Sequence, residues 1–279
     1  MASPDLSAAI EMVACSDPGR VRTNNEDAVL ANARLGLAVL ADGMGGYNAG
    51  EVASGMATAA LGSELAHAFE TRPPEETTDS GEPWAHAALR DVIARTNAAI
   101  HRAAQTQPQC AGMGTTLVAV QFHDDRVTVA HLGDSRLYRL RDGTLKQLTR
   151  DHSLLQEQID SGMLDPEQAR FSQNKNLVTR AMGVEETVDT EIGEHGVRPG
   201  DVYLLCSDGL NDMVADDEIE ACLTAMSANL PVCAQQLVHM ANDNGGKDNV
   251  SVILAKVKQS FPASRAREGL WWRVRSWFK

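Results

Sequence analysis

The chain has 279 residues, which is long enough to bury a full hydrophobic core in one large domain or two small ones. Its formal net charge of −13 argues against nucleic acid as a partner, because phosphate contacts require a basic surface. The five cysteines form no Cys-x-x-Cys pair, no secretory signal is visible, and no apolar run approaches the ~18 residues that span a bilayer, so we expect free thiols and a cytoplasmic protein.

The first half of the chain predicts strands followed by two long helices. Strands are expected over 11–16, 27–31 and 35–41. Apolar residues at helical spacing in an alanine-rich setting then predict a helix over 50–69. The acidic, proline-rich segment that follows ends this helix, and a second helix is expected over 84–104.

The second half predicts a meander of antiparallel strands and then helices again. Strands are expected over 115–121, 126–132, 137–140 and 144–148, the last two joined by the hairpin turn Arg141-Asp142-Gly143. After a short helix over 153–161 and a polar, irregular segment over 162–180, we expect strands over 201–206 and 249–257, with helices over 216–226 and 231–243 between them. Helices and strands come in blocks, which predicts an α+β fold of antiparallel sheets with helices on their outer faces.

Acidic residues stand at the ends of several of these apolar strands. Asp42 comes directly after one strand, Asp208 closely follows another, and Asp248 precedes the last. Converging carboxylates repel one another and are costly to desolvate, so either they lie apart on the surface or cations bind among them. Oxygen ligands of this kind suit Mg²⁺ or Mn²⁺ better than zinc.

Each acidic segment has an ordinary interpretation when it is taken alone. Asn24-Asn25-Glu26-Asp27 is typical of a solvated turn, since Asn and Asp stabilise turns through local hydrogen bonds. The glycine-rich run 43–46 is either a flexible turn or a place where backbone approaches an ion or phosphate closely. Gly245-Gly246-Lys247-Asp248 is not a phosphate-binding P-loop, because Asp follows the lysine in place of Ser or Thr.

Seven motifs nevertheless stand in one characteristic order. They are Arg22-x-x-Asn25-Glu26-Asp27, Asp42-Gly43-Met44-Gly45-Gly46, Gly114-Thr115-Thr116, Gly133-Asp134-Ser135-Arg136, Asp151-His152-Ser153, Ser207-Asp208-Gly209 and Asp248-Asn249. In this order they resemble the metal-dependent serine/threonine protein phosphatases of type 2C, the PPM family, and above all its compact bacterial branch. The resemblance covers roughly residues 10 to 257. It implies a four-layer α/β/β/α sandwich of two antiparallel sheets flanked by helices.

The resemblance also implies which residues bind metal. Asp42 would bridge two Mn²⁺ or Mg²⁺ ions, and the carbonyl of Gly43 would bind one of them. Asp208 and Asp248 would hold the other ion. Asp134, together with Asp208, matches the position for a third, weaker ion. Two ions about 3.5–4 Å apart can lower the pKa of a shared water and screen the phosphoryl oxygens during in-line attack.

Three further motif residues are expected beside these ligands. Glu26 and Asp27 belong to the same cluster by resemblance, partly through water. Arg22 matches the arginine that holds the substrate phosphate, so Arg22 and Asp42 are the expected catalytic residues. A planar guanidinium supplies paired hydrogen bonds to phosphate that lysine cannot reproduce.

One position departs from the pattern of many eukaryotic members. Met44 stands where they have the histidine proposed as the general acid, and methionine cannot donate a proton. His152 is the nearest motif histidine, although a structural role is the favoured interpretation. Cys206 lies next to the site in sequence, but its apolar strand argues against a thiol nucleophile.

These observations predict a phosphatase acting on phosphoserine and phosphothreonine in proteins, opposing a bacterial Ser/Thr kinase. Two alternatives remain open, a small-molecule phosphoesterase and a catalytically silent phosphoprotein-binding module. The catalytic domain is expected over 1–260, with the family's flap over about 162–180.

The segment 261–279 forms a tail with a composition of its own. It carries five basic residues against one acid, Glu268, and three of the four tryptophans. A basic, aromatic helix of this kind suits the inner membrane face or an acidic partner. The alternative is that the tail folds back onto the acidic domain or frays.

Overall fold

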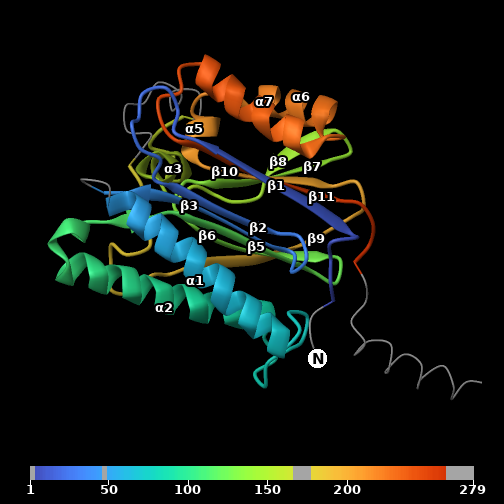
Figure 1. The fold of residues 1–279 in the computed structure, drawn as a ribbon, viewed down its shortest axis with the longest axis horizontal. Coiled ribbons are helices and arrows are strands. Elements are labelled where there is room, and N and C mark those ends of the chain that lie inside the picture. The colour runs from blue at the N-terminus through green and yellow to red at the C-terminus, as the bar shows by residue number, and fades with distance from the viewer. Residues whose placement is uncertain (1–3, 46–48, 166–176, 262–279) are drawn as a thin grey trace, which may run out of the picture.

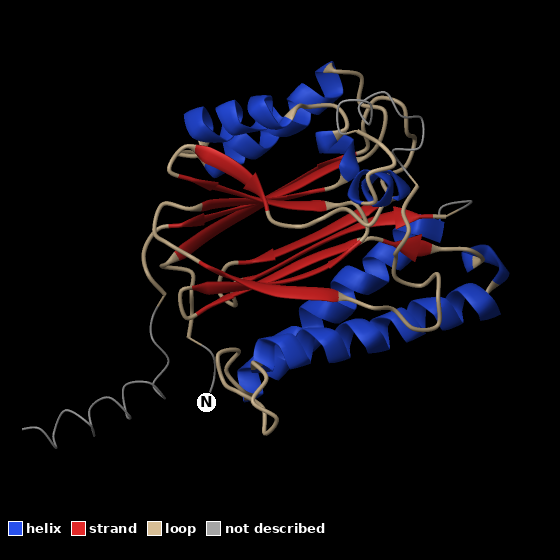
Figure 2. Cartoon of the chain, turned by 180° about the vertical axis from the view of Figure 1, so that it is seen from behind, coloured by secondary structure: helices blue, strands red, loops and turns tan. Residues whose placement is uncertain are grey.

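The computed structural model describes residues 4–45, 49–165 and 177–261. They form four layers, with two antiparallel sheets packed face to face and a pair of helices over each outer face (Figure 1 and Figure 2). One sheet is covered by α1 (Ala49–Thr71) and α2 (Trp84–Thr106), and the other by α6 (Asp216–Met226) and α7 (Leu230–Asp243). The predicted α+β sandwich is confirmed.

The two sheets divide the strands between them, and every pairing is antiparallel. The first sheet has the order β1 (Ile10–Asp17), β11 (Val250–Val257), β10 (Val202–Cys206), β7 (Arg136–Arg141) and β8 (Thr144–Gln147). The second has the order β2 (Asp27–Asn32), β3 (Leu37–Met44), β5 (Leu117–His123), β6 (Arg126–Leu132) and β9 (Glu191–Gly196), with β4 (Gly114–Thr115) paired to the end of β3. Short helices complete the described chain: η1 (Pro108–Cys110), α3 (Leu154–Asp160) and α5 (Asp208–Asn211).

Side chains alternate between the two faces of each strand, so the apolar residues form three layers. One layer lies between the two sheets, and one lies between each sheet and its helices. In β3, Val39 and Ala41 pack under α1 and α2, whereas Leu40 packs between the sheets. Phe122 of β5 meets Tyr203 of β10 edge-on across this inter-sheet layer, with ring centroids 5.1 Å apart. Because side chains alternate along a strand, the next inward position after Leu40 in β3 is Asp42.

The buried side chains of α1 are small in its first turns, where the backbone at Gly50 lies against Gly43 of β3. Ala49, Ala53 and Ala57 are fully buried at helical spacing, and the larger Leu61 and Phe69 fill the layer toward the far end. The first turn of α1 can therefore lie against the end of β3, at the same end of the sandwich as α5 (Figure 1). This end carries the predicted site.

Strand β9 was not expected from the sequence. Its residues include two glycines and only one large aliphatic side chain, Ile192, so the apolar alternation that marks a strand is missing. The strand forms because its backbone pairs with β6 at the edge of the second sheet. The helix α5, only four residues long, was also not predicted.

Two predicted segments lie largely outside the described residues. These are 166–176 of the expected flap and 262–279 of the expected tail. Phe261, which the sequence analysis placed in the tail, is instead 6% exposed and packs edge-on against Phe122 in the inter-sheet layer. Its backbone N–H donates to Asp125 Oδ1 at 2.7 Å, so the packed domain extends through this residue. No helix among the described residues is long and apolar enough to cross a membrane.

Candidate metal centre

Strand pairing and two strand ends bring the predicted carboxylates to one end of the inter-sheet layer. Asp27 of β2 stands directly opposite Asp42 of β3 in the antiparallel register, so both side chains point to the same face. Asp208 begins α5 just after β10, and Asp248 lies just before β11. The charges of these residues and of Asp134 all act on the carboxyl group of Asp42. We refer to Asp27, Asp42, Asp134, Asp208 and Asp248 as the acidic cluster.

Burial and like charges raise the pKa values of this cluster. Burial is the largest cause for Asp42 and Asp208, whose pKa values lie well above the ordinary range, and the neighbouring aspartates raise them further. Burial raises the pKa of Asp27 to about 6, although hydrogen bonds from nearby hydroxyl groups oppose the shift. The pKa of Asp134 is also raised to about 6, again chiefly by burial. Ionising all of these groups without counter-ions is therefore unfavourable.

Hydroxyl groups next to the acidic cluster form hydrogen bonds that hold one of its carboxylates in place. Ser207 Oγ donates to Asp27 Oδ2 at 2.9 Å and accepts the backbone N–H of Ser251 at 3.0 Å. The hydroxyl of Ser251 lies 2.7 Å from that of Ser16. These bonds fix the direction of the Asp27 carboxylate. These hydroxyl groups were not predicted from the sequence, where small polar residues at the ends of otherwise apolar strands were the available signal for them.

The backbone at Asp42 is held by the junction between β4 and β5. Its N–H donates to Thr116 Oγ1 at 3.0 Å, and its carbonyl accepts from the Thr116 N–H and the Thr115 hydroxyl, both at 2.9 Å. Thr116 Oγ1 also lies 2.7 Å from the hydroxyl of Ser135, the neighbour of Asp134. The Gly-Thr-Thr and Gly-Asp-Ser motifs thus position two members of the cluster together.

The acidic cluster fits a divalent metal ion. Asp27 Oδ1 is buried without a hydrogen-bond partner among the described residues, which leaves an anionic oxygen for a cation to satisfy. Within the described chain, the only ion pair made by the cluster is the one between Asp248 and Arg22. The remaining charge is negative and all the donors are oxygens, as hard ions such as Mg²⁺ and Mn²⁺ require.

Arg22 lies at the mouth of the site. Its Nη2 donates to Asp248 Oδ2 at 2.7 Å, and its side chain is 51% exposed. The hydrogen bond to Asp248 is the first cause of its raised pKa, and charges from Glu26 and Asp208 add to it. An exposed guanidinium held by one carboxylate keeps other N–H groups free for a phosphate.

Glu26 and Gly43 meet at the start of α1. The Glu26 carbonyl accepts from the Gly43 N–H at 3.1 Å and from the Ser54 hydroxyl at 2.5 Å. A Cβ on Gly43 would lie only 2.2 Å from the carbonyl oxygen of Gly50, so this position requires glycine. Burial, opposed by Arg22, raises the pKa of the Glu26 carboxyl group.

Asn249 has a role that the sequence analysis did not assign. Its Oδ1 accepts the Glu26 N–H at 2.8 Å, and its Nδ2 donates to the carbonyls of Pro18 at 3.0 Å and Asn24 at 2.8 Å. One buried amide therefore fixes the loop that carries both Arg22 and Glu26. In the sequence, the only indication of this role was that Asn249 directly follows Asp248 in the Asp248-Asn249 motif.

The remaining motif residues lie around the cluster. Asp134 is 7% exposed, and after burial it is the largest cause of the raised pKa of Asp208. His152 Nδ1 accepts the Gly133 N–H at 3.2 Å, which is the kind of structural bond expected of it. Burial raises the pKa of Cys206 to about 12, so its thiolate is strongly disfavoured.

Known proteins resemble the chain over most of its length. A family model described as protein phosphatase 2C matches residues 20–248. The chain is 40% identical over 252 residues to "Serine/threonine protein phosphatase PstP" of Mycobacterium tuberculosis, a match covering 90% of this chain but only 46% of that protein. It is 38% identical over 244 residues to "Serine/threonine phosphatase stp" of Listeria welshimeri, covering 86% and 93% of the two proteins.

Solved structures agree with these matches. The crystal structure of M. tuberculosis PstP superposes with a TM-score of 0.80 at 40% identity, covering 90% of this chain and 100% of that one. A structure of the PstP catalytic domain in complex with 2 manganese ions gives a TM-score of 0.77 and covers 90% of this chain. The sandwich, the ordered motifs and the match over residues 20–248 lead to one conclusion: the chain belongs to the protein phosphatase 2C family.

Proposed function

We propose that the chain is a metal-dependent protein phosphatase that hydrolyses phosphoserine and phosphothreonine on proteins. The observation that carries the proposal is the acidic cluster, in which carboxylates with raised pKa values converge beside an exposed arginine. The relatives named protein phosphatases support a protein substrate over a small molecule. A complete carboxylate set supports an active enzyme over a silent binding module.

The same cluster supports a proposal for the metal ligands. Asp42 would be shared by two ions, the Gly43 carbonyl would hold one of them, and Asp208 with Asp248 would hold the other. Bound Mn²⁺ or Mg²⁺ would lower the pKa of a water and screen phosphoryl charge. The 2 manganese ions in the related PstP domain support two ions of this kind. A third ion is proposed at Asp134, next to Asp208.

The chain's own residues bind and orient the substrate. Arg22 receives the phosphate through N–H groups not used by Asp248, and Asn249 keeps the Arg22 loop in place. The hydroxyl of Ser207 keeps Asp27 directed into the site. Met44 cannot protonate the leaving alcohol, so that proton comes from another group or from solvent.

A phosphate-release assay tests the proposal. Phosphoserine and phosphothreonine peptides should be hydrolysed with Mn²⁺ or Mg²⁺ and not with excess EDTA, and phosphorylated metabolites should be poor substrates. Turnover that is insensitive to EDTA, or that clearly favours metabolites, would contradict it. We further propose that the physiological substrates are products of a bacterial Ser/Thr kinase, since that reaction class supplies these phosphoesters.

Replacing Arg22 by Ala should raise KM for phosphopeptides roughly 10- to 100-fold, with a smaller change in kcat, because a bidentate contact to phosphate is lost. Arg22→Lys should restore the charge but only part of the binding. The matched control is Arg20→Ala, an exposed arginine of the same loop, which should leave KM unchanged. Calorimetry should show Mn²⁺ bound by Arg22→Ala, and loss of metal binding there would contradict the division of roles.

The tail is proposed to localise the enzyme without contributing to chemistry. Its basic and aromatic composition supports contact with an anionic membrane face or an acidic partner, and the kinase complex is one such partner. Phe261 is part of the packed domain, so a clean truncation must keep it.

Deleting 262–279 should therefore leave phosphopeptide kcat/KM unchanged and reduce binding to vesicles containing anionic lipid. Co-sedimentation with anionic and with neutral vesicles measures the difference, and added salt should weaken the interaction. If the full chain and the truncated chain bind anionic vesicles equally, the membrane proposal is wrong.

A further inference from the structure

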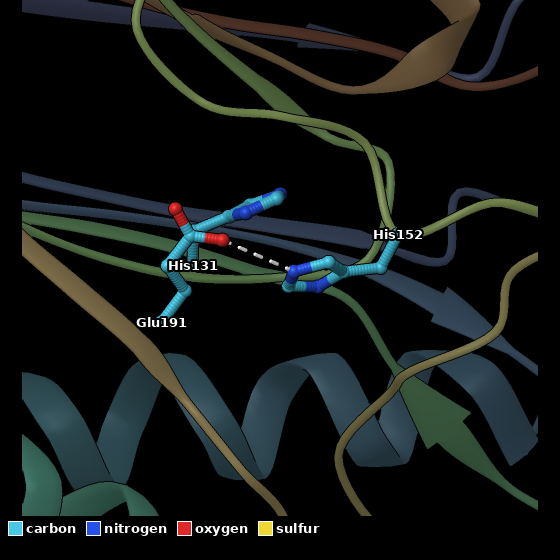
Figure 3. Close-up of side chains that lie close together, drawn as sticks. All are labelled: His131, His152 and Glu191. Atoms are coloured by element: carbon cyan, nitrogen blue, oxygen red, sulfur yellow. Dashed lines mark hydrogen bonds and ion pairs between the residues drawn. The ribbon is translucent and has the colours of Figure 1, made fainter. Parts of the chain in front are cut away.

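A second group of potential metal ligands lies outside the acidic cluster and differs from it in chemistry. His131 of β6 stands opposite Glu191 of β9 in the antiparallel register, and His152 precedes α3. Figure 3 shows the three side chains lying close together. One ligand atom from each of the three lies within 4.8 Å of the others. The two imidazole rings are stacked, with centroids 4.6 Å apart. We refer to His131, His152 and Glu191 as the histidine site.

His131 is unsatisfied in this arrangement. The residue is 2% exposed, and neither ring nitrogen has a hydrogen-bond partner among the described residues. The backbone of Gly133 and Ser135 is near enough to favour the charged ring slightly, but not at hydrogen-bonding geometry. Buried polar nitrogens are seldom left without partners, so a missing ligand explains this residue better than packing does.

Both imidazoles have the neutral charge that metal binding requires. Burial, followed by the neighbouring His152, lowers the pKa of His131 to about 3, and burial also lowers the pKa of His152. Both rings are therefore neutral at pH 7. His152 Nδ1 accepts the Gly133 N–H at 3.2 Å, so its proton is on Nε2, which lies 3.4 Å from Glu191 Oε2.

We propose that the histidine site binds a Zn²⁺ ion through one imidazole nitrogen each of His131 and His152 and the carboxylate of Glu191. Two imidazoles and a carboxylate suit zinc, whereas the all-oxygen acidic cluster suits Mg²⁺ or Mn²⁺. Ligand atoms on a tetrahedral zinc ion lie about 3.4 Å apart, so the group must contract. Glu191 has a 59% exposed side chain and can supply that movement.

Zinc binding would change the protonation of one ring. The proton of His152 would move from Nε2 to Nδ1 by exchange with solvent, and Nδ1 would give up the hydrogen bond from the Gly133 N–H. The freed Nε2 lone pair would bind the ion, and Glu191 would change from a hydrogen-bond acceptor to a ligand. Arg180 is close enough to lower the pKa of both histidines, and its charge opposes a cation in the same way. The carboxylate of Glu191 offsets that charge, which makes Glu191 the ligand on which affinity should depend most.

The bound ion would join three separate parts of the fold. It would connect edge strand β9 to β6 and to the loop at His152. That loop is already bonded to the last residues of the expected flap, because the Thr179 N–H donates to the His152 carbonyl at 2.8 Å and the Leu154 N–H donates to the Leu177 carbonyl at 2.9 Å. The proposed role is a structural link at the base of this segment.

The histidine site can be tested by calorimetric titration of the full-length protein with ZnCl₂. The protein should carry Asp42→Asn and the buffer excess Mg²⁺, because both weaken zinc binding at the acidic cluster. One Zn²⁺ per chain should bind, with a heat that depends little on the buffer because both rings are already neutral. Glu191→Gln should weaken this binding by about a hundredfold or more, because loss of an outer-shell partner alone typically costs about 10- to 100-fold. The matched control, Glu186→Gln, is an exposed residue outside the site and should bind like the parent.

His131→Phe keeps an aromatic ring stacked on His152 and should abolish zinc binding. If the His131→Phe protein fails to fold, the Glu191→Gln result decides whether the histidine site binds zinc. Absence of zinc binding, or equal affinity in Glu191→Gln and the parent, would overturn the proposal. The readout is binding and not turnover, so it fails or succeeds independently of the proposed phosphatase activity.

Discussion

Asp42→Asn should lower phosphopeptide turnover roughly a thousandfold or more at saturating Mn²⁺, because the variant loses the anionic ligand proposed to be shared by both ions. Asp208→Asn should have a comparable effect. Asp79→Asn, at an exposed position in the loop between α1 and α2, is the control and should keep full activity. Near wild-type turnover in Asp42→Asn or Asp208→Asn would show that the residue is wrongly assigned.

In the absence of metal, the Asp42→Asn variant should have a free energy of unfolding at least as large as that of the parent protein. A pKa raised well above the ordinary range means that ionised Asp42 opposes folding at pH 7, and Asn removes that cost. Two other members of the acidic cluster, Asp27 and Asp134, should make the stability of the metal-free protein depend on pH. Their stabilising contribution is present below an unfolded pKa of 3.8 and is lost as pH rises through about 6. Thermal unfolding in EDTA between pH 4 and 7 would measure it.

Gly43→Ala should destabilise the domain by about 3 kcal/mol or more. The new Cβ would lie 2.2 Å from the Gly50 carbonyl oxygen and 2.6 Å from that of Glu26, and both obstacles are backbone. To remove this clash, the first turn of α1 must move away from the end of β3. Because the proposed metal ligands Asp42 and Gly43 lie at that end, metal affinity should fall as well.

The matched control is Gly55→Ala in the same helix. A Cβ there meets nothing within 4 Å, so the substitution should stabilise the protein by about 0.5–1 kcal/mol through helix propensity alone. Denaturant unfolding of both variants measures the contrast. Equal stability of Gly43→Ala and wild type would mean that the contact between β3 and α1 is looser than described.

Most of the fold could be predicted because its strands and helices carry strong periodic patterns. The apolar run before Asp42 and the alanine-rich face of α1 are clear local signals, and the ordered motifs placed the acidic residues at one site. Strand β9 lacked such a signal, since its pairing with β6 is made by backbone. Periodicity reports side chains, so it misses elements that tertiary pairing creates.

The supporting residues of the site were also beyond sequence reasoning. Ser207 and Asn249 belong to quoted motifs, yet their partners Asp27, Glu26 and Pro18 lie about two hundred residues away in the chain. The same holds for the histidine site, because His131, His152 and Glu191 come together only through the pairing of β6 with β9. Such contacts depend on topology, which local patterns do not contain.

The pairing of Asp27 with Asp42 makes the register of one strand pair part of the proposed metal centre. A shift of β2 by one residue against β3 would place Asp27 opposite Ala41 or Gly43. One carboxylate would then turn toward α1 while the other still faced the opposite sheet. A misaligned chain could not assemble the cluster even with every residue present. Metal binding at the proposed centre would therefore report correct folding as well as prepare the chain for activity.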